Sequence, residues 1–337
     1  MNWFEELTGF KEDDYASTRA QLAVDGTELV VRGSGRRYGI GELELVSLAE
    51  LRDRVSRQPE RDARLRVRSV SGDVRQMHQL QAYEGALFQV ASQFNLLEMV
   101  SPEVTPEDGV TGYQFDATQG PACAIAAGAA TIYRNFFAPV GEHVGQTRDR
   151  QLDGLADMGV ELAAVIGVPV SSLWTMRNGY ALCTEHALTL IGRHLDALDE
   201  AARDRLRSRL RIGMHWQVEV TDGMAVPRPR VSQAFCSALP VAYTRIPGHR
   251  WAPFARLVLE AAYEATLLAA ALHRARGGTN VVVLTRLGGG AFGNDARWID
   301  DATARAVEVA RGCDLDVHLV TRGTPTPAML ALARAWP

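Results

Sequence analysis

A glycine-rich loop toward the C-terminal end of the chain has the composition of a phosphate-binding loop. The end of a strand predicted over 280–287 leads into it, and its residues are Gly288, Gly289, Gly290, Ala291, Phe292, Gly293 and Asn294. Because glycine adopts positive φ angles and has no Cβ, such a loop lets a ligand approach the backbone closely. A nest of backbone N–H groups there would suit a diphosphate. The alternative is a tight turn between a strand and a helix, with no ligand.

Polar residues also follow two other strand-like runs. Asp73, followed by the apolar Val74, comes after the strand predicted over residues 64–70, and Asn95 comes after the apolar run 86–91. A carboxylate can accept a hydrogen bond from an exocyclic amine, and a carboxamide can bridge two ribose hydroxyls. The alternatives are an ordinary turn at Asp73 and a buried structural asparagine at Asn95.

A third candidate is the segment Asp116–Pro121, which opens the helix predicted over residues 121–136. Gln119 and Gly120 stand at the start of this helix, where unpaired N–H groups attract anions. Asp116 would then stand close to the ligand. The alternative is that Asp116 or Thr118 simply caps the helix.

The elements that must position these residues alternate between strand and helix. Further strands are predicted over 231–236, 280–287 and 316–321, and helices over 254–274, 300–311 and the C-terminal residues. This alternation predicts an α/β protein with a three-layer α/β/α arrangement and a mixed, mostly parallel sheet. In such a sheet ligands lie beyond the carboxyl ends of the strands, which is where the three candidate segments fall.

Two parts of the chain interrupt this alternation. Residues 1–60 are predicted to form an N-terminal appendage, with a hairpin of 28–32 and 42–46 followed by a helix over 48–57. Residues 61–337 would form the main domain. Within it, 137–230 is predicted to be a helical insertion, with helices near 151–166 and 183–198 and a strand over 212–221.

Composition excludes several classes of protein. The 337 residues are 47% hydrophobic and 23% charged, which predicts a globular protein with a large core. A net charge of -4 gives no reason to expect binding to nucleic acid.

No targeting or membrane-spanning segment is predicted, and four scattered cysteines indicate a reducing, cytoplasmic setting. The eight histidines and the cysteines show no ligand spacing, so neither a metal site nor a cofactor is expected.

Taken in order, these pieces resemble the macrodomain family of ADP-ribose-binding proteins, over about residues 66–322. The resemblance implies that Asp73, with Val74, holds the adenine amino group and that Asn95 holds the distal ribose. It implies that residues 288–294 hold the diphosphate and ribose. It also implies that Gln119 and Gly120 face the diphosphate from the other side.

Within this family the chain is most similar to divergent, bacterial effector-like hydrolases that remove ADP-ribose from arginine. That similarity is carried by the 288–294 loop with Trp298 and Ile299 after it, and by Thr118–Pro121. Two features depart from the family. Residues 96–99 replace its first glycine-rich loop, and the 121–136 helix lacks the paired glutamates of poly(ADP-ribose) glycohydrolases, which argues against cleavage of the polymer.

Hydrolysis at the anomeric carbon of ADP-ribose requires a carboxylate that stabilises positive charge or deprotonates water. Asp116 and Asp295 are the preferred catalytic candidates, and Glu98 and Asp301 are further candidates. Asp300 and Asp301 have an alternative explanation, as acidic residues that stabilise a helix N-terminus.

The resemblance therefore predicts an ADP-ribosylhydrolase that acts on a mono-ADP-ribosylated protein, with arginine as one possible attachment site. One alternative is a reader module that binds ADP-ribose without cleaving it, and another is a hydrolase of free ADP-ribose derivatives. Residues 174–180 of the insertion would shape the side that faces the protein substrate, unless they are a packed aromatic helix start.

Overall fold

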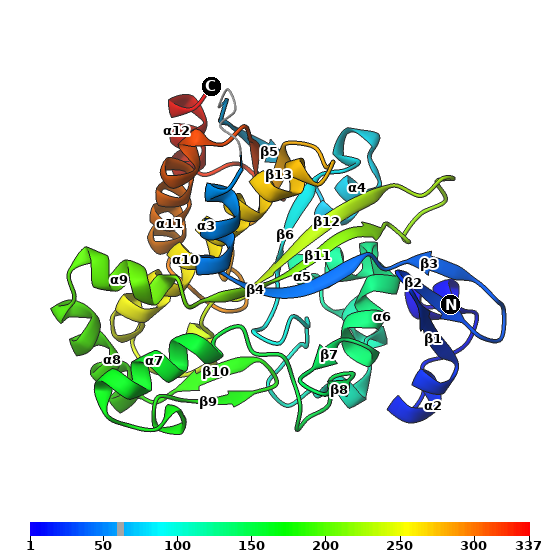
Figure 1. Ribbon diagram of the computed structural model, residues 1–337, viewed down its shortest axis with the longest axis horizontal. Coiled ribbons are helices and arrows are strands. Elements are labelled where there is room, and N and C mark those ends of the chain that lie inside the picture. Colours follow the sequence, from blue (N-terminus) through cyan, green and yellow to red (C-terminus); the bar gives the residue numbers. More distant parts are fainter. Residues whose placement is uncertain (59–63) are drawn as a thin grey trace.

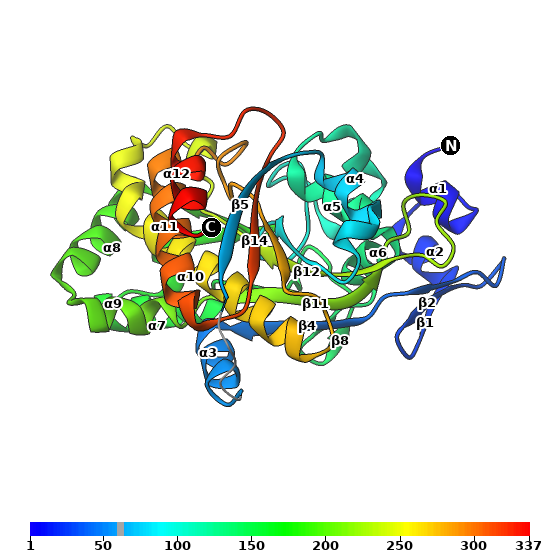
Figure 2. The same ribbon diagram turned by 90° about the horizontal axis from the view of Figure 1, so that it is seen from above.

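A seven-stranded sheet forms the centre of the computed structural model, which describes residues 1–58 and 64–337. In order across the sheet, its strands are β4 (Glu42–Ser47), β11 (Arg211–Glu219), β12 (Arg230–Cys236), β6 (Leu87–Ala91), β13 (Val281–Leu284), β14 (Asp316–Thr321) and β5 (Arg66–Ser71). Figure 1 labels these strands except β14, which Figure 2 labels beside β5. The strands from β12 to β5 run parallel, whereas β11 is antiparallel to both of its neighbours. The predicted mixed, mostly parallel sheet is confirmed.

Helices cover both faces of this sheet, as Figure 2 shows from above. One face carries α3 (Leu48–Ser56), α10 (Gly248–Ala275), α11 (Ala296–Val309) and α12 (Pro327–Ala335); the other carries α4 (Val74–Gln79), α5 (Gln119–Ala126) and α6 (Gly128–Phe136). The largest buried cluster lies on the α10 side, because this helix is apolar around most of its circumference. The three-layer α/β/α arrangement is therefore confirmed.

The N-terminal residues pair differently from the prediction. The predicted hairpin of 28–32 and 42–46 is wrong, because β2 (Glu28–Val31) pairs with β1 (Leu22–Asp25) and β3 (Arg37–Gly39), while β4 pairs with β11 in the main sheet. Helices α1 (Trp3–Thr8) and α2 (Tyr15–Ala20) accompany the small sheet. Its apolar residues pack against α5 and α6. The predicted domain boundary near residue 60 lies outside the described residues and stays a prediction.

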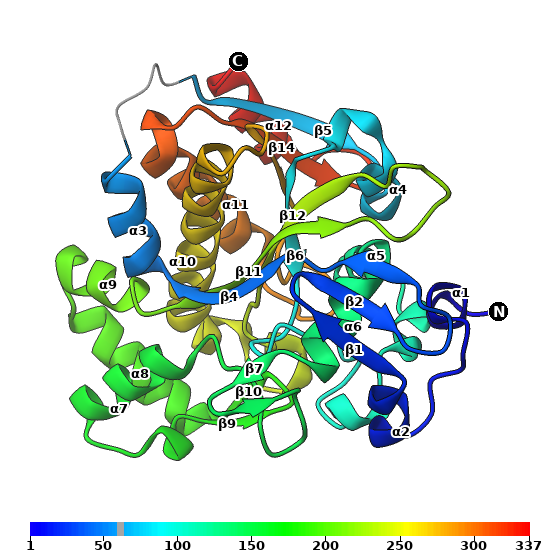
Figure 3. The same cartoon turned by 45° about the vertical axis from the view of Figure 1, so that its right-hand side comes forward.

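The predicted insertion is only partly helical. It contains α7 (Ala156–Ile166), α8 (Glu185–Ala197) and α9 (Glu200–Arg207), which Figure 3 shows at one end of the molecule. It also contains the strand pairs β7 (Pro139–Val140) with β8 (His143–Val144), and β9 (Trp174–Arg177) with β10 (Tyr180–Cys183). Residues 174–180 belong to a β-hairpin, so the alternative that they are a packed aromatic helix start is wrong, and β11 belongs to the main sheet.

The helix predicted over residues 121–136 is broken at Ala127. The carbonyl of Ala126 accepts hydrogen bonds from the amides of Thr221 and Asp222, at 2.9 Å and 3.2 Å. Ala127 has non-helical φ and ψ angles of -113° and 55°. The residues that follow β11 thus donate to a carbonyl that a continuous helix would use, and α5 and α6 form instead of one helix.

Candidate functional site

A cavity of about 420 Å³ lies at the carboxyl ends of β6, β12 and β13. This is the edge of the sheet at which a ligand is expected in an α/β protein. The residues of its wall come from four segments, at 91–100, 115–121, 238–243 and 285–292, together with Tyr180 of β10. Of the predicted site residues, the cavity brings together Glu98, Asp116, Gln119, Gly120, Gly288, Gly290, Ala291 and Phe292.

The glycine loop forms one wall of this cavity. Gly288 and Gly293 have positive φ angles of 73° and 69°, and the amide of Asn294 donates to the carbonyl of Gly288 at 2.9 Å. Within the described part of the chain, the amides of Gly290, Ala291 and the next residue, Phe292, have no hydrogen-bond acceptor. Three successive N–H groups without partners, in residues that line a cavity, form a suitable site for an anion.

The end of β13 is held in place by a tyrosine of α10. The hydroxyl of Tyr263 donates to the carbonyl of Thr285 at 2.6 Å and accepts from the amide of Leu287 at 2.8 Å. Tyr263 is buried. The glycine loop therefore starts from a fixed point on the core.

The start of α5 forms the opposite wall and is docked on the end of β6. The side chain of Gln119 accepts from the amide of Ala91 and donates to the carbonyl of Gln89, both at 2.8 Å. A Cβ on Gly120 would stand 1.9 Å from the carbonyl oxygen of Ala91 and 3.2 Å from Cγ of Glu98. Only glycine permits this close approach of helix, strand and carboxylate.

Glu98 is a buried carboxylate in the wall of the cavity. Nη2 of Arg134 lies 3.2 Å from each of its two oxygens, and the amide of Glu98 donates to the hydroxyl of Tyr113. Burial raises the pKa of Glu98 to about 7, while the charge of Arg134 opposes this rise. Glu98 therefore exchanges its proton close to neutral pH, which suits an acid or base catalyst.

Arg134 is itself buried and held by several partners. Its Nε donates to the carbonyl of Leu96 at 3.0 Å, its Nη2 also donates to Thr131, and its guanidinium lies 3.8 Å from the centre of the Phe235 ring. These contacts fix the cation that faces Glu98.

Asp116 is the second carboxylate on the cavity wall and is partly exposed. One of its oxygens accepts from the amide of Thr118 at 2.8 Å, and Thr118 is the residue that precedes α5. The two carboxylates on the cavity therefore both come from the segment between β6 and α5.

The other two predicted catalytic residues lie away from the cavity wall. Asp295 caps α11, because this helix begins at residue 296 and not at 300 as predicted, and hydrogen bonds from Arg297 lower its pKa. Asp301 forms an ion pair with Arg256 at 3.0 Å. The structure thus favours Glu98 and Asp116 by position, the reverse of the sequence preference for Asp295 over Glu98.

Asn95 is buried and hydrogen-bonded within the fold, an arrangement that fits the alternative of a structural asparagine. Its side-chain amide donates to Gln151 at 2.8 Å, and its side-chain oxygen accepts from the amide of Leu97 at 3.1 Å. It does not belong to the cavity wall. Its predicted contact with a ribose has no support in this geometry.

Asp73 caps α4 and also lies outside the cavity wall. Its carboxylate accepts from the amides of Arg75 and Gln76 and lies 3.5 Å from Arg322. Val74 is buried in the first turn of the same helix. Gly289, Gly293 and Asn294 belong to the glycine loop but not to the cavity wall.

Sequence reasoning missed part of an aromatic wall. The rings of Tyr180, Tyr243 and Phe292 lie 5.1–5.6 Å apart, centre to centre, and all three line the cavity. Tyr243 follows the carboxyl end of β12, so the strand-end argument applied to this strand would have found it. Tyr180 comes from the predicted insertion, which therefore contributes to the cavity.

Within the described residues, no group of three or more histidine, cysteine or acidic side chains is placed to hold a metal ion. In the same part of the chain, no helix combines the length and the apolar character needed to cross a membrane.

Comparisons with known proteins yield only distant likenesses. No protein-family model matches the chain, and no curated protein matches it. A poly(ADP-ribose) glycohydrolase structure from Thermomonospora curvata shares 14% identity, covering 95% of this chain and 97% of that one, with a TM-score of 0.46. A poly(ADP-ribose) glycohydrolase from Deinococcus radiodurans in complex with ADP-ribose shares 13%, covering 87% and 92%, with a TM-score of 0.43. At these scores the likeness assigns neither a family nor a function to this chain.

Proposed function

We propose that this protein is an ADP-ribosylhydrolase that cleaves the bond at the anomeric carbon of a mono-ADP-ribosyl group. One observation carries the proposal: a single cavity is lined both by Gly290–Phe292, whose amides have no acceptor among the described residues, and by the buried carboxylate of Glu98. The first suits a diphosphate and the second suits hydrolysis of a glycosidic bond. The order of the sequence motifs, which resembles that of macrodomains, points to the same ligand.

In this mechanism the diphosphate binds the glycine loop and so places the distal ribose between that loop and α5. The ionised Glu98 accepts a proton from water as the water oxygen bonds to the anomeric carbon. The bond to the leaving atom breaks with its electron pair, and Glu98 returns the proton to that atom. The products are ADP-ribose and the unmodified group.

Asp116 has a separate role in this proposal. Its partly exposed carboxylate stabilises the positive charge that develops on the ribose in the transition state. The aromatic wall of Tyr180, Tyr243 and Phe292 contacts the sugar and limits the access of water.

For the substrate, we propose a protein that carries mono-ADP-ribose, with arginine as one attachment site. The support is the sequence resemblance to arginine-directed hydrolases and the absence of paired glutamates from the predicted 121–136 helix. The proposal that residues 174–180 face the protein substrate is supported by Tyr180, which lies at the cavity.

A reader module is the second candidate function. Both oxygens of Glu98 lie 3.2 Å from Arg134, and an ion pair of this kind can serve structure alone. A reader would bind ADP-ribose through the same glycine loop and release nothing.

The test measures the release of ADP-ribose from an arginine-ADP-ribosylated protein. We expect release by the native protein and a loss of at least about 100-fold in the rate for Glu98→Gln, the typical scale of acid–base catalysis. Asp295→Asn is the matched control, because this carboxylate lies outside the cavity wall, and it should keep full activity. Free ADP-ribose derivatives serve as the competing substrates.

The dependence of the rate on pH identifies the role of Glu98. Because the base form is required, kcat/KM should rise with pH through about 7, the pKa of Glu98. Binding of ADP-ribose without release at any pH would establish the reader, and full activity of Glu98→Gln would remove Glu98 from the mechanism.

A further inference from the structure

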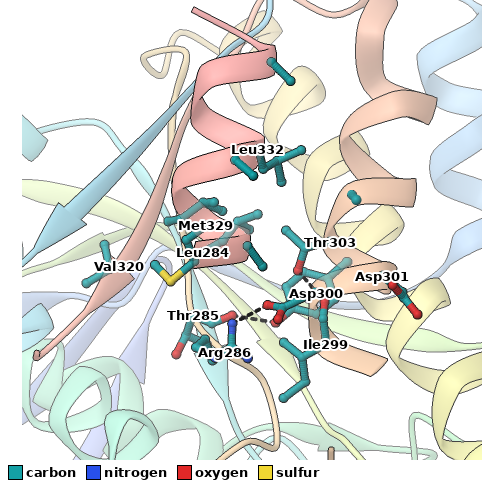
Figure 4. Close-up of a pocket in the computed structure, with 16 residues that line it drawn as sticks. Leu284, Thr285, Arg286, Ile299, Asp300, Asp301, Thr303, Val320, Met329 and Leu332 are labelled. Carbon is teal, nitrogen blue, oxygen red and sulfur yellow. Dashed lines mark hydrogen bonds and ion pairs between the residues drawn. The ribbon is translucent and has the colours of Figure 1, made fainter. Parts of the chain in front are cut away.

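Glu98 stands on an irregular loop, residues 92–99, so no helix or strand fixes its backbone. Another carboxylate that pairs with arginine shows the contrast. Asp300, which forms an ion pair with Arg286 in Figure 4, belongs to α11. The helix sets the position of Asp300, whereas the position of Glu98 depends on the contacts of its loop.

Gln93 is the side chain that closes this loop. Its Oε1 accepts from the amide of Met99 at 2.7 Å, and its Nε2 donates to the carbonyl of the same residue at 3.1 Å. Its own backbone amide donates to the carbonyl of Leu97 at 2.9 Å. Gln93 is buried and lines the cavity. Three hydrogen bonds of one residue thus hold the residues on either side of Glu98.

The turn of the β9–β10 hairpin holds the same loop. The hydroxyl of Tyr180 donates to the carbonyl of Met99 at 2.6 Å and lies 3.4 Å from Nε2 of Gln93. The carbonyl of Gly179 accepts from the amide of Phe94 at 3.0 Å. A Cβ on Gly179 would stand 2.6 Å from Cβ of Gln93, so the turn packs closely against this side chain.

The backbone of the loop is strained at Leu96, which has a φ angle of 64°. A residue other than glycine keeps such an angle only where the surrounding contacts enforce it, and strain of this kind occurs at active sites. The amide of Leu96 donates to the carbonyl of Gln93 at 3.0 Å. Loss of the side-chain bonds of Gln93 would therefore let Leu96 relax, and Glu98, two residues later, would move with it.

From these contacts we infer that Gln93 is a positioning residue, which holds the carboxylate of Glu98 at the cavity for hydrolysis. The inference rests on the proposed function of Glu98. Arg134 of α6 and Tyr113 contact Glu98, and Cys123 of α5 interacts with its charge. Within the described part of the chain, Gln93 forms a hydrogen bond with none of these three. It therefore acts on Glu98 through the backbone of the loop.

The experiment removes the side-chain bonds of Gln93 and keeps its volume, in the variant Gln93→Met. Gln233→Met is the matched control. Gln233 is also a buried glutamine, its side-chain amide donates to the carbonyl of Cys123 at 2.9 Å, and it does not line the cavity. Urea unfolding should show a similar loss of stability in the two variants, since each loses hydrogen bonds of a buried amide. Tyr180→Phe, which keeps the ring and loses the bond to Met99, is the second test variant.

The rate of ADP-ribose release measures the effect on hydrolysis. We expect Gln93→Met to lower kcat about 10- to 100-fold, because a displacement of about 1 Å in a reacting group is enough for such a loss. KM should stay close to the native value, since the substitution leaves the glycine loop unchanged. Gln233→Met should keep the native kcat.

An NMR titration follows the carboxyl group of Glu98 itself and needs no activity. Glutamate labelled with ¹³C at the carboxyl group supplies the signal, and Glu98→Gln assigns it. Burial raises the pKa of Glu98 to about 7, so a loop that opens to water should lower this pKa toward 4.5. We expect a lower midpoint in Gln93→Met and, by a smaller amount, in Tyr180→Phe. The rise of kcat/KM with pH should move to lower pH in the same way, and Gln233→Met should titrate as the native protein does.

The two readouts separate the inference from the proposed function. If the native protein releases no ADP-ribose, the proposed function fails, and the midpoint still tests whether Gln93 places Glu98. An unchanged midpoint in Gln93→Met overturns the inference, whatever its kcat. An equal loss of kcat in Gln93→Met and Gln233→Met also overturns it, because lost stability would then explain both. If Gln93→Met does not fold, an unchanged midpoint in Tyr180→Phe is the refuting result.

Discussion

Replacement of Arg134 by methionine tests whether the charge of Glu98 depends on this one cation. The substitution keeps much of the volume but leaves a buried carboxylate without a partner. Both side chains are fully buried in the native protein. Breaking such a pair by removing one partner costs about 3–5 kcal/mol in the free energy of unfolding. The pKa of Glu98, already about 7, must rise further.

The sign of the pH dependence follows from this rise. Glu98 has a folded-state pKa above its unfolded value of 4.5, so its contribution to stability is greatest at low pH and is lost as pH rises. In the native protein this loss ends near pH 7. In Arg134→Met it continues to higher pH, so the cost of the substitution should grow by up to about 1.4 kcal/mol per pH unit above 7.

Urea unfolding of both proteins at pH 6, 7 and 8 measures this difference, with the double variant Glu98→Gln/Arg134→Met as the control. The double variant has no buried charge, so it should recover part of the lost stability and show no growth in cost with pH. Curves for Arg134→Met and the native protein that stay parallel over this range would refute the dependence of the Glu98 charge on Arg134.

Two further substitutions probe the walls of the cavity and the catalytic assignment. Gly120→Ala must separate α5 from β6, since its Cβ would lie 1.9 Å from the carbonyl oxygen of Ala91 and real Cβ atoms essentially never come closer than 3.0 Å to such an atom. We expect about 1–3 kcal/mol less stability by urea unfolding and weaker ADP-ribose binding by calorimetry. Gly112→Ala is its control, because a Cβ there meets no atom within 4 Å, and equal stability of the two variants would contradict the close approach. Asp295→Asn keeps the helix cap and should retain native stability and native hydrolysis; a large loss of hydrolysis would return Asp295 to the catalytic site.

The position of the candidate site could be predicted because it depends on a property of the sheet. The ends of β6 and β13 meet at one edge whatever the side chains do, so Gly120 and the glycine loop could be placed together from the sequence. The role of Asn95 could not, because its partner Gln151 is distant in the sequence and reaches it only through the fold.

The choice among carboxylates also lay beyond the sequence. A shift of four residues in the start of α11 turns Asp295 from a loop residue into a helix cap. Buried Glu98 pairs with Arg134 of α6, and no pattern in the sequence indicated this contact. The local sequence pattern thus identified the candidate carboxylates, and contacts between residues distant in the sequence decided which of them line the cavity.

The order of strands has a consequence for synthesis of the chain. β4 and β5 are consecutive strands of the main sheet along the sequence, yet they form its two opposite borders. Their neighbours, β11 and β14, leave the ribosome much later, and the last of these ends at Thr321. β4 can therefore join the sheet once β11, which ends at Glu219, is made, whereas β5 gains its neighbour only with β14, the last strand of the sheet. A nascent chain thus has to keep β5 out of wrong pairings until translation is almost complete.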